Sequence, residues 1–238
     1  MRSSVIRYPR LAWSLLLGST VALAQQASVN ARVELVRAGH RLKDSSQAVV
    51  WLTAVGTTPS HLAQAEIPKL VQKDKAFHPS ILVIPVGGKV EFPNHDPFFH
   101  NVFSLFEGKR FDLGLYERGT TRIVQFDKPG VSYIFCNIHA QMSAVIVALN
   151  TPYYSVSDVR GDISIENVPP GRYELQVFHA SVVPEALRAL TRDITITGGD
   201  TSIGTLRLAE SNLELAHKNK YGRDYDRPEP DSPAYARP

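Results

Sequence analysis

Short apolar runs alternate with turn-forming residues over most of the chain. Runs that are β-branched or alternate between apolar and polar positions are typical of strands, and Gly or Pro clusters separate most of them. The strands predicted by this pattern are 29–36, 48–52, 81–86, 89–92, 121–126, 131–135, 144–149, 162–165, 172–178, 193–196 and 203–208. Helical periodicity is weak, with short candidates at 60–65 and 184–190. Many short strands at regular spacing predict an all-β fold of the sandwich or barrel class.

The amino-terminal segment departs from this pattern. Residues 1–24 contain no acidic residue. Their three arginines all lie in the first ten positions, and the apolar run 11–17 and an Ala-Leu-Ala end come after them. A basic start, a short apolar centre and small residues at the end predict a secretory signal peptide that is cleaved after Ala24. The apolar run is short for a membrane anchor, which needs about 20 residues. We therefore expect a periplasmic or secreted protein with no stable membrane span.

The basic net charge of the chain is weak evidence for a nucleic acid partner. The 238 residues include 26 Lys and Arg against 23 Asp and Glu, and this basic excess is a feature of nucleic-acid-binding proteins. The three arginines of 1–24 account for the whole excess, because 23 basic residues remain without them. The mature chain is then formally neutral, and we expect no nucleic acid partner.

Cysteine content limits the chemistry more strongly. Cys136 is the only cysteine, so the chain forms no intramolecular disulfide and builds no multi-cysteine zinc or iron–sulfur site. A single cysteine is unusual in an exported protein, where cysteines are often paired. Cys136 is therefore either a buried thiol without a function or a residue protected by something that it binds.

The residues around this cysteine favour a metal site. Cys136, His139 and Met142 have the spacing C-x2-H-x2-M directly after the predicted strand 131–135, and His100 follows the predicted strand 89–92. One thiolate, two imidazoles and one thioether are the complete ligand set of a blue-copper site, a trigonal His2Cys plane with a weak axial Met. The sequence thus predicts one type 1 copper ion.

The same residues also allow interpretations other than a blue-copper site. A lone Cys or Met is more often part of an apolar core, and His95 is the main rival of His100 as a ligand. No H-x-H pair occurs, which disfavours the clustered histidines of oxygen-reducing copper sites. The chain has no phosphate-binding loop, paired catalytic carboxylates or nucleophile elbow, so we expect no enzyme.

The segment 66–150 resembles the cupredoxins, in particular the small amicyanin- and plastocyanin-like proteins. The resemblance is carried by Phe77-His78-Pro79, the Asn94 and Asp96 turn, His100-Asn101-Val102, Pro129-Gly130, Tyr133 and the Cys136 loop. The run 111–116 and the Cys-Asn-Ile-His form are similar to exported cupredoxins of the methylamine-utilisation-like type. The ligand loop lacks the proline that is common in amicyanin-type loops.

This resemblance implies a Greek-key β-sandwich over 64–150 and adds residues to the site. It implies that the amide of Asn101 hydrogen-bonds the thiolate and that its side chain steadies the ligand loop. It also implies that His139 passes electrons near the surface, within an apolar patch of Pro97, Phe98, Phe99 and Ala140; core packing is the alternative for the two phenylalanines. The expected partner is a redox protein, either a cytochrome or a periplasmic dehydrogenase.

A second stretch, 161–175, resembles the transthyretin-like sandwich of carboxypeptidase regulatory domains. Such a domain begins with two strands that 29–36 and 48–52 would supply. We therefore expect a second, smaller and discontinuous β-sandwich, 28–62 plus 152–210, which carries the cupredoxin as an insertion. The alternative is that 28–62 extends the cupredoxin. The tail 216–238 is polar and proline-rich, which predicts disorder.

Together these features predict an exported copper protein that relays single electrons. Two alternatives remain at this point. The same site serves a periplasmic copper carrier or sensor, or the chain is a non-redox binding module in which the regulatory-type sandwich recognises a partner.

Overall fold

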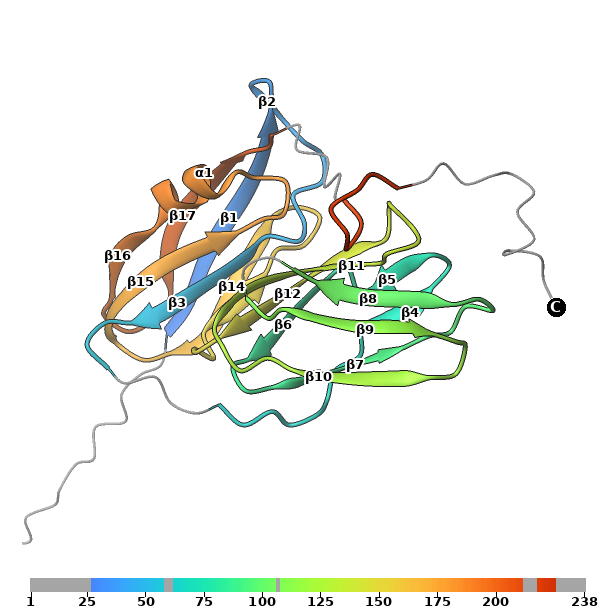
Figure 1. Ribbon diagram of the computed structural model, residues 1–238. Coiled ribbons are helices and arrows are strands. Elements are labelled where there is room, and N and C mark those ends of the chain that lie inside the picture. Colours follow the sequence, from blue (N-terminus) through green and yellow to red (C-terminus); the bar gives the residue numbers. More distant parts are fainter. Residues whose placement is uncertain (1–26, 58–61, 106–107, 212–217, 226–238) are drawn as a thin grey trace, which may run out of the picture.

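The chain folds almost entirely into strands. A computed structural model describes residues 27–57, 62–105, 108–211 and 218–225. The fold is all-β, as the sequence predicts, and α1 (Pro184–Leu190) is the one α-helix of these residues (Figure 1). No helix in the described part of the chain is both long enough and apolar enough to cross a membrane. The predicted signal peptide, 1–24, lies outside the described residues.

The first sandwich combines the two ends of the described chain. Its first sheet has the order β14-β1-β17, with β2 beside β1, and its second has the order β13-β3-β15-β16. The bounds are β1 (Ala27–Arg37), β2 (His40–Arg41), β3 (Val49–Ala54), β13 (Tyr154–Val156), β14 (Asp162–Val168), β15 (Gly171–Phe178), β16 (Arg192–Ile196) and β17 (Thr201–Ala209). We call this body the terminal sandwich. Strand β3 lies between β13 and β15, both of which follow residue 150.

The second sandwich is built from the residues between β3 and β13, and we call it the central sandwich. Its larger sheet has the order β6-β12-β11-β8-β9, and the pairs β10-β7 and β4-β5 cover it. The bounds are β4 (Val71–Lys73), β5 (Ala76–His78), β6 (Ile81–Pro85), β7 (Lys89–Pro93), β8 (His100–Ser104), β9 (Phe111–Tyr116), β10 (Thr121–Gln125), β11 (Gly130–Phe135) and β12 (Ser143–Leu149). In Figure 1 its green and yellow strands lie beside the blue and orange strands of the terminal sandwich.

Strand β12 explains how the two bodies pack. Its sequence is apolar at six consecutive positions, without the alternation of a strand with one wet face. One face packs into the core of the central sandwich through Ala144, Ile146 and Ala148. The other face packs against the terminal sandwich, where Val145, Val147 and Leu149 meet Val49 and Phe178. A continuous apolar run therefore marks a strand shared by two cores.

Hydrophobic periodicity does not predict two strands near the candidate ligands, β8 and β9. β8 is buried at all five positions although it contains His100, Asn101 and Ser104, so polar residues hide its strand pattern. β9 alternates poorly because Gly114 interrupts it. The short helix 184–190 is present, whereas Leu62 to Ala65 are not helical and residues 60–61 lie outside the described residues.

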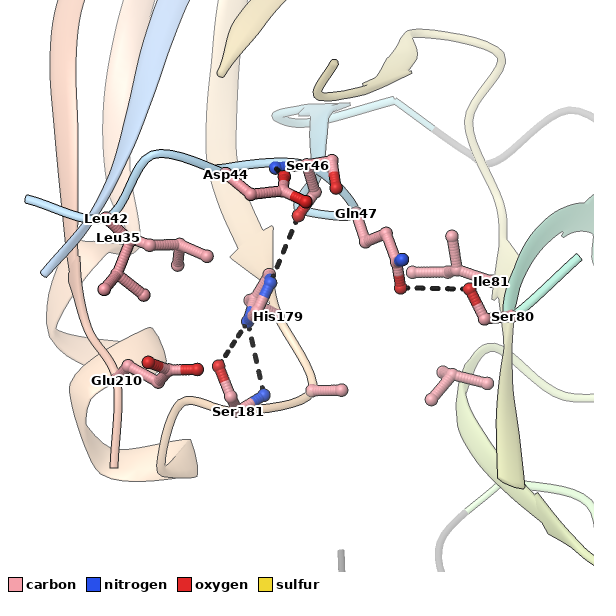
Figure 2. A pocket seen from close by; sticks show the side chains of 12 residues that line it. Leu35, Leu42, Asp44, Ser46, Gln47, Ser80, Ile81, His179, Ser181 and Glu210 are labelled. Atoms are coloured by element: carbon pink, nitrogen blue, oxygen red, sulfur yellow. Dashed lines mark hydrogen bonds between the residues drawn. The ribbon is translucent and has the colours of Figure 1, made fainter. Parts of the chain in front are cut away.

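A pocket of about 390 Å³ lies between the two sandwiches, and its polar groups bond to the chain itself (Figure 2). His179 donates from Nε2 to the carbonyl oxygen of Ser46 at 3.2 Å. Its Nδ1 accepts from the backbone N–H and the hydroxyl of Ser181 at 3.2 and 2.9 Å. Burial lowers the pKa of His179, so the ring stays neutral. We read this cluster as a hydrogen-bonded junction.

We expect Gly161→Ala to test the pairing of the two ends. Gly161 has φ +84°, and a Cβ there would overlap the backbone carbonyl of Val33 on β1. Its own carbonyl accepts from the Val33 amide at 2.7 Å. Because the backbone must move, the substitution should lower the free energy of unfolding by about 3 kcal/mol or more in denaturant titrations. Gly39→Ala is the matched control, since Gly39 has φ +82° in open space and should cost only about 1 kcal/mol. Equal losses would contradict this packing.

Candidate metal centre

Neighbouring strands carry the residues of the candidate site. His100 begins β8, and Cys136 follows the last residue of β11, which pairs with β8 through Phe135 and Phe103. Residues 136–142 then form the loop that joins β11 to β12. The loop closes on itself, because Cys136 donates its amide to Met142 O at 3.1 Å and Met142 donates to His139 O at 3.0 Å. The loop is therefore fixed at both ends by strands of one sheet.

Three donor atoms converge at this point. Cys136 Sγ lies 3.8 Å from His100 Nδ1 and 3.6 Å from His139 Nδ1, and the three ligand atoms lie within 4.8 Å of one another. All three residues are buried, with His139 the most exposed at 6%. A bound transition metal lies about 2.0 Å from an imidazole nitrogen and about 2.3 Å from a thiolate sulfur. The sum, about 4.3 Å, exceeds both separations, so one ion can reach the sulfur and either nitrogen at a bent angle.

Asp96 fixes the orientation of His100, and sequence reasoning missed this role. Its carboxylate is bonded to His100 Nε2 at 2.7 Å, which leaves Nδ1 facing the cysteine. The same carboxylate accepts the backbone amides of Asp74 and Lys75, at 2.7 and 3.0 Å, from the turn between β4 and β5. The signal was present in the sequence as a carboxylate four residues before the histidine. Metal-binding histidines are commonly held in this way through their second nitrogen.

The electrostatics of the site keep the imidazoles ready to bind. Burial lowers the pKa of His100, against the raising effect of Asp96. Burial and the nearby His100 lower the pKa of His139 to about 4. Burial would raise the pKa of Asp96, but hydrogen bonds from the Lys75 amide, His100 and the Asp74 amide outweigh it and hold the pKa below its usual value. Ligand histidines must be neutral, and these two are neutral at pH 7.

The thiol responds to two opposing influences. Burial raises the pKa of Cys136, whereas backbone hydrogen bonds from Asn101, Ile138 and His139 lower it without cancelling the effect of burial. The thiol therefore carries its proton when no ion is present, and an ion that binds the sulfur displaces that proton. The three amide groups then face a thiolate, which they stabilise.

Asn101 is placed differently from the sequence expectation in one respect. Its backbone amide is one of the hydrogen-bonding groups that lower the pKa of Cys136. Its side chain does not donate to the ligand loop; Nδ2 donates to Asp112 Oδ1 at 2.7 Å and to Gly114 O at 2.9 Å, both on β9. The physical reason is a bulge in the pairing of β8 with β9, where Gly114 has φ +67°, which brings these acceptors to the buried amide. Asn101 thus ties β8 to β9.

Met142 and His95 have contrasting positions. Met142 is fully buried in the same apolar cluster as Cys136, at the end of the ligand loop. His95, the sequence rival of His100, is exposed, and its backbone amide donates to Gln72 O at 2.9 Å. The structure therefore brings together His100, Cys136 and His139, with Met142 beside them in the loop.

An apolar surface lies over the two histidines. The Phe98 ring is 5.1 Å from the His100 ring and 5.7 Å from the His139 ring, so it covers both imidazoles. Phe99 is 54% exposed, and Pro97 and Ala140 are also exposed. Core packing therefore does not explain Phe99, and it explains Phe98 only in part.

Comparisons with known proteins return cupredoxins among solved structures. A purple cupredoxin from Nitrosopumilus maritimus is 22% identical, with a TM-score of 0.32, over 35% of this chain and 100% of its own. A copper-containing nitrite reductase from Thermus scotoductus is 24% identical, with a TM-score of 0.34, over 48% of this chain and 28% of its own. A reduced Cu(I) amicyanin variant is 17% identical, with a TM-score of 0.33, over 41% of this chain and 98% of its own.

No protein-family profile matches the chain, and the search of curated proteins found no match. All three structural similarities have low identities and TM-scores. The case for the site therefore rests on its own residues and their geometry.

We expect Asp96→Asn to weaken metal binding. The amide keeps an acceptor for His100 but loses the negative charge and one of the acceptors for the Asp74 and Lys75 amides. Loss of such a supporting residue typically lowers metal affinity about 10- to 100-fold. Competition against a chelator of known affinity measures the change. Asp193→Asn, an exposed residue of the terminal sandwich, is the control. An affinity equal to that control would contradict the role of Asp96.

Proposed function

We propose that the chain is an exported type 1 copper protein that relays single electrons. In this proposal His100, Cys136 and His139 hold one copper ion in a plane and Met142 is the axial ligand. The observation that carries the proposal is a buried cysteine sulfur faced by the Nδ1 atoms of two neutral imidazoles. Copper in such a ligand set supplies a one-electron couple between Cu(II) and Cu(I).

The residues of the chain limit rearrangement between the two oxidation states. Asp96 holds the His100 ring from behind, and the backbone bonds of Cys136 and Met142 hold the ligand loop. Amide groups of Asn101, Ile138 and His139 stabilise negative charge on the sulfur. A site that already has its final geometry needs little movement when its charge changes by one, and this property suits electron transfer.

The apolar surface suggests where a partner docks. The Phe98 ring packs against His139, which we propose as the exit for the electron, and the exposed Pro97, Phe99 and Ala140 are the chain neighbours of these two residues. An apolar contact excludes water and lets a partner approach closely without a strict charge pattern. A cytochrome or a periplasmic dehydrogenase is the partner class that we propose, with the segment 1–24 acting as the export signal.

The remaining parts of the chain have proposed roles as well. We propose that 28–62 and 152–210 form one discontinuous domain of the carboxypeptidase regulatory type, because β3 pairs with β13 and β15. We propose no substrate turnover by the copper site. The pocket beside His179 offers little support for a non-redox binding module, since its polar groups bond to the chain itself.

Visible and electron-spin spectroscopy after Cu(II) addition tests the copper site. We expect an intense thiolate-to-copper band with one ion per chain, abolished in Cys136→Ser. Met142→Leu should retain the band but alter the reduction potential, because the axial ligand tunes the potential. His100→Gln should lose the band, whereas the matched control His95→Gln should keep it. A band that survives in Cys136→Ser would refute the proposal.

A second measurement separates electron transfer from copper carriage. Repeated oxidation and reduction of the loaded protein in the presence of a chelator should leave the copper bound, because the ligands are held in place in both states. Copper retained on the protein is measured by metal analysis after each cycle. Transfer of the ion to the chelator on every reduction would favour the carrier function instead.

A further inference from the structure

The carboxyl-terminal segment 218–225 lies against the ligand loop, although its composition predicts disorder. It folds into a compact turn in which Asn219 donates its amide to Arg223 O at 2.8 Å and Gly222 donates to Asn219 O at 2.9 Å. The Asn219 side chain accepts the amides of Tyr221 and Arg223 at 3.0 and 3.1 Å. We call residues 218–225 the strap; Figure 1 shows it in dark red beside β11.

Two of its side chains and one amide hold the strap to the metal centre. Tyr225 donates its hydroxyl to the carbonyl oxygen of Cys136, the cysteine of the site, at 2.6 Å. Lys220 donates its backbone amide to Asn137 Oδ1 in the ligand loop at 2.9 Å. Lys220 Nζ also pairs with Asp112 on β9 at 2.8 Å. The strap therefore contacts both the ligand loop and the β9 strand beside the site.

Asp112 connects these contacts to Asn101. Its Oδ1 accepts Asn101 Nδ2 at 2.7 Å, while its Oδ2 accepts Lys220 Nζ at 2.8 Å. A continuous chain of bonds thus runs from Asn101, next to His100, through Asp112 and Lys220 to Asn137, next to Cys136. This chain of bonds links the side chain of Asn101 to the ligand loop through Asp112 and the strap.

The individual contacts of the strap contribute little stability, which points to a role in positioning. The Lys220–Asp112 pair is partly exposed, with side-chain exposures of 22% and 38%, and such a pair contributes little to stability. The strap adds no donor atom to the site. What it supplies is geometry, because it joins the ligand loop to β9, which Asp112 connects to Asn101 on β8, and so restrains the relative motion of these elements.

We propose that the strap is a clamp on the copper centre, in which Lys220 and Tyr225 are positioning residues that slow the opening of the ligand loop. The clamp rests on the copper function proposed above. With the strap in place, the loop of Cys136 and His139 is held by Lys220 and Tyr225 as well as by its own strands. Its loosening should speed both release of the ion and entry of reagents to Cys136.

Substitutions in the full-length protein test the clamp. Tyr225→Phe removes one hydroxyl, and Lys220→Met removes the ion pair while keeping the backbone bond to Asn137. We expect each to speed copper transfer to a chelator by about tenfold, the size of effect typical for residues that support metal ligands. We also expect a shifted thiolate-to-copper band in Tyr225→Phe. Tyr154→Phe is the matched control, because Tyr154 lies on β13 of the terminal sandwich and is 39% exposed.

A readout in the metal-free protein makes the test independent of copper. The rate at which a thiol reagent labels Cys136 should rise severalfold in Tyr225→Phe and Lys220→Met, and should stay at the wild-type value in Tyr154→Phe. Wild-type protein that binds no copper would overturn the proposed function, while the labelling rates still decide the clamp. Labelling and release rates of both variants within twofold of the control would overturn the clamp.

Discussion

Strand β12 belongs to two cores at once, and the positions of both sandwiches and of the metal centre depend on this. Alternate side chains of the strand enter the central core and the junction with the terminal sandwich. Full burial of one Val, Leu or Ile is worth about 1.5–3 kcal/mol, and β12 buries four such residues and two alanines, so its position is strongly fixed by packing. The ligand loop ends on this strand. The candidate metal site is thus attached to a strand that is packed on both faces.

Two carboxylates, the buried Asp96 and the exposed Asp112, organise the polar groups around the site. Asp96 is hydrogen-bonded to His100 and to two amides of the turn between β4 and β5. Asp112 accepts hydrogen bonds from Asn101, Gly114 and Lys220. Neither carboxylate is one of the three residues that face the candidate ion. Their effect is to convert the flexible side chain of a histidine and an asparagine into fixed groups, since each accepts several hydrogen bonds at once.

Three of the four candidate donor residues can be picked out from the sequence because they lie close together in it. Cys136, His139 and Met142 share one loop, and their residue types alone indicate a soft metal ion. The supports are harder to predict, because Asp112 meets Lys220 across more than a hundred positions and no local pattern marks that contact. Hydrophobic periodicity does not predict strand β8, because its polar residues are buried. Composition does not predict the structure of the strap, because that structure depends on contacts with the ligand loop. The strand pattern elsewhere is predictable wherever one face of a strand is buried and the other is wet.

The pairing of β1 with β17 has a consequence for how the chain becomes structured. Val29 lies opposite Thr201, so the terminal sandwich cannot complete its sheets until nearly the whole chain has been synthesised. The strands of the central sandwich, in contrast, pair only among themselves and are all present by residue 149. During synthesis, β1 and β3 wait as unpaired strand edges, the kind of surface that associates with other chains. The candidate metal centre belongs to the central sandwich, which can fold early. The terminal sandwich, whose strands come before and after it in the sequence, is the body that is exposed to mispairing.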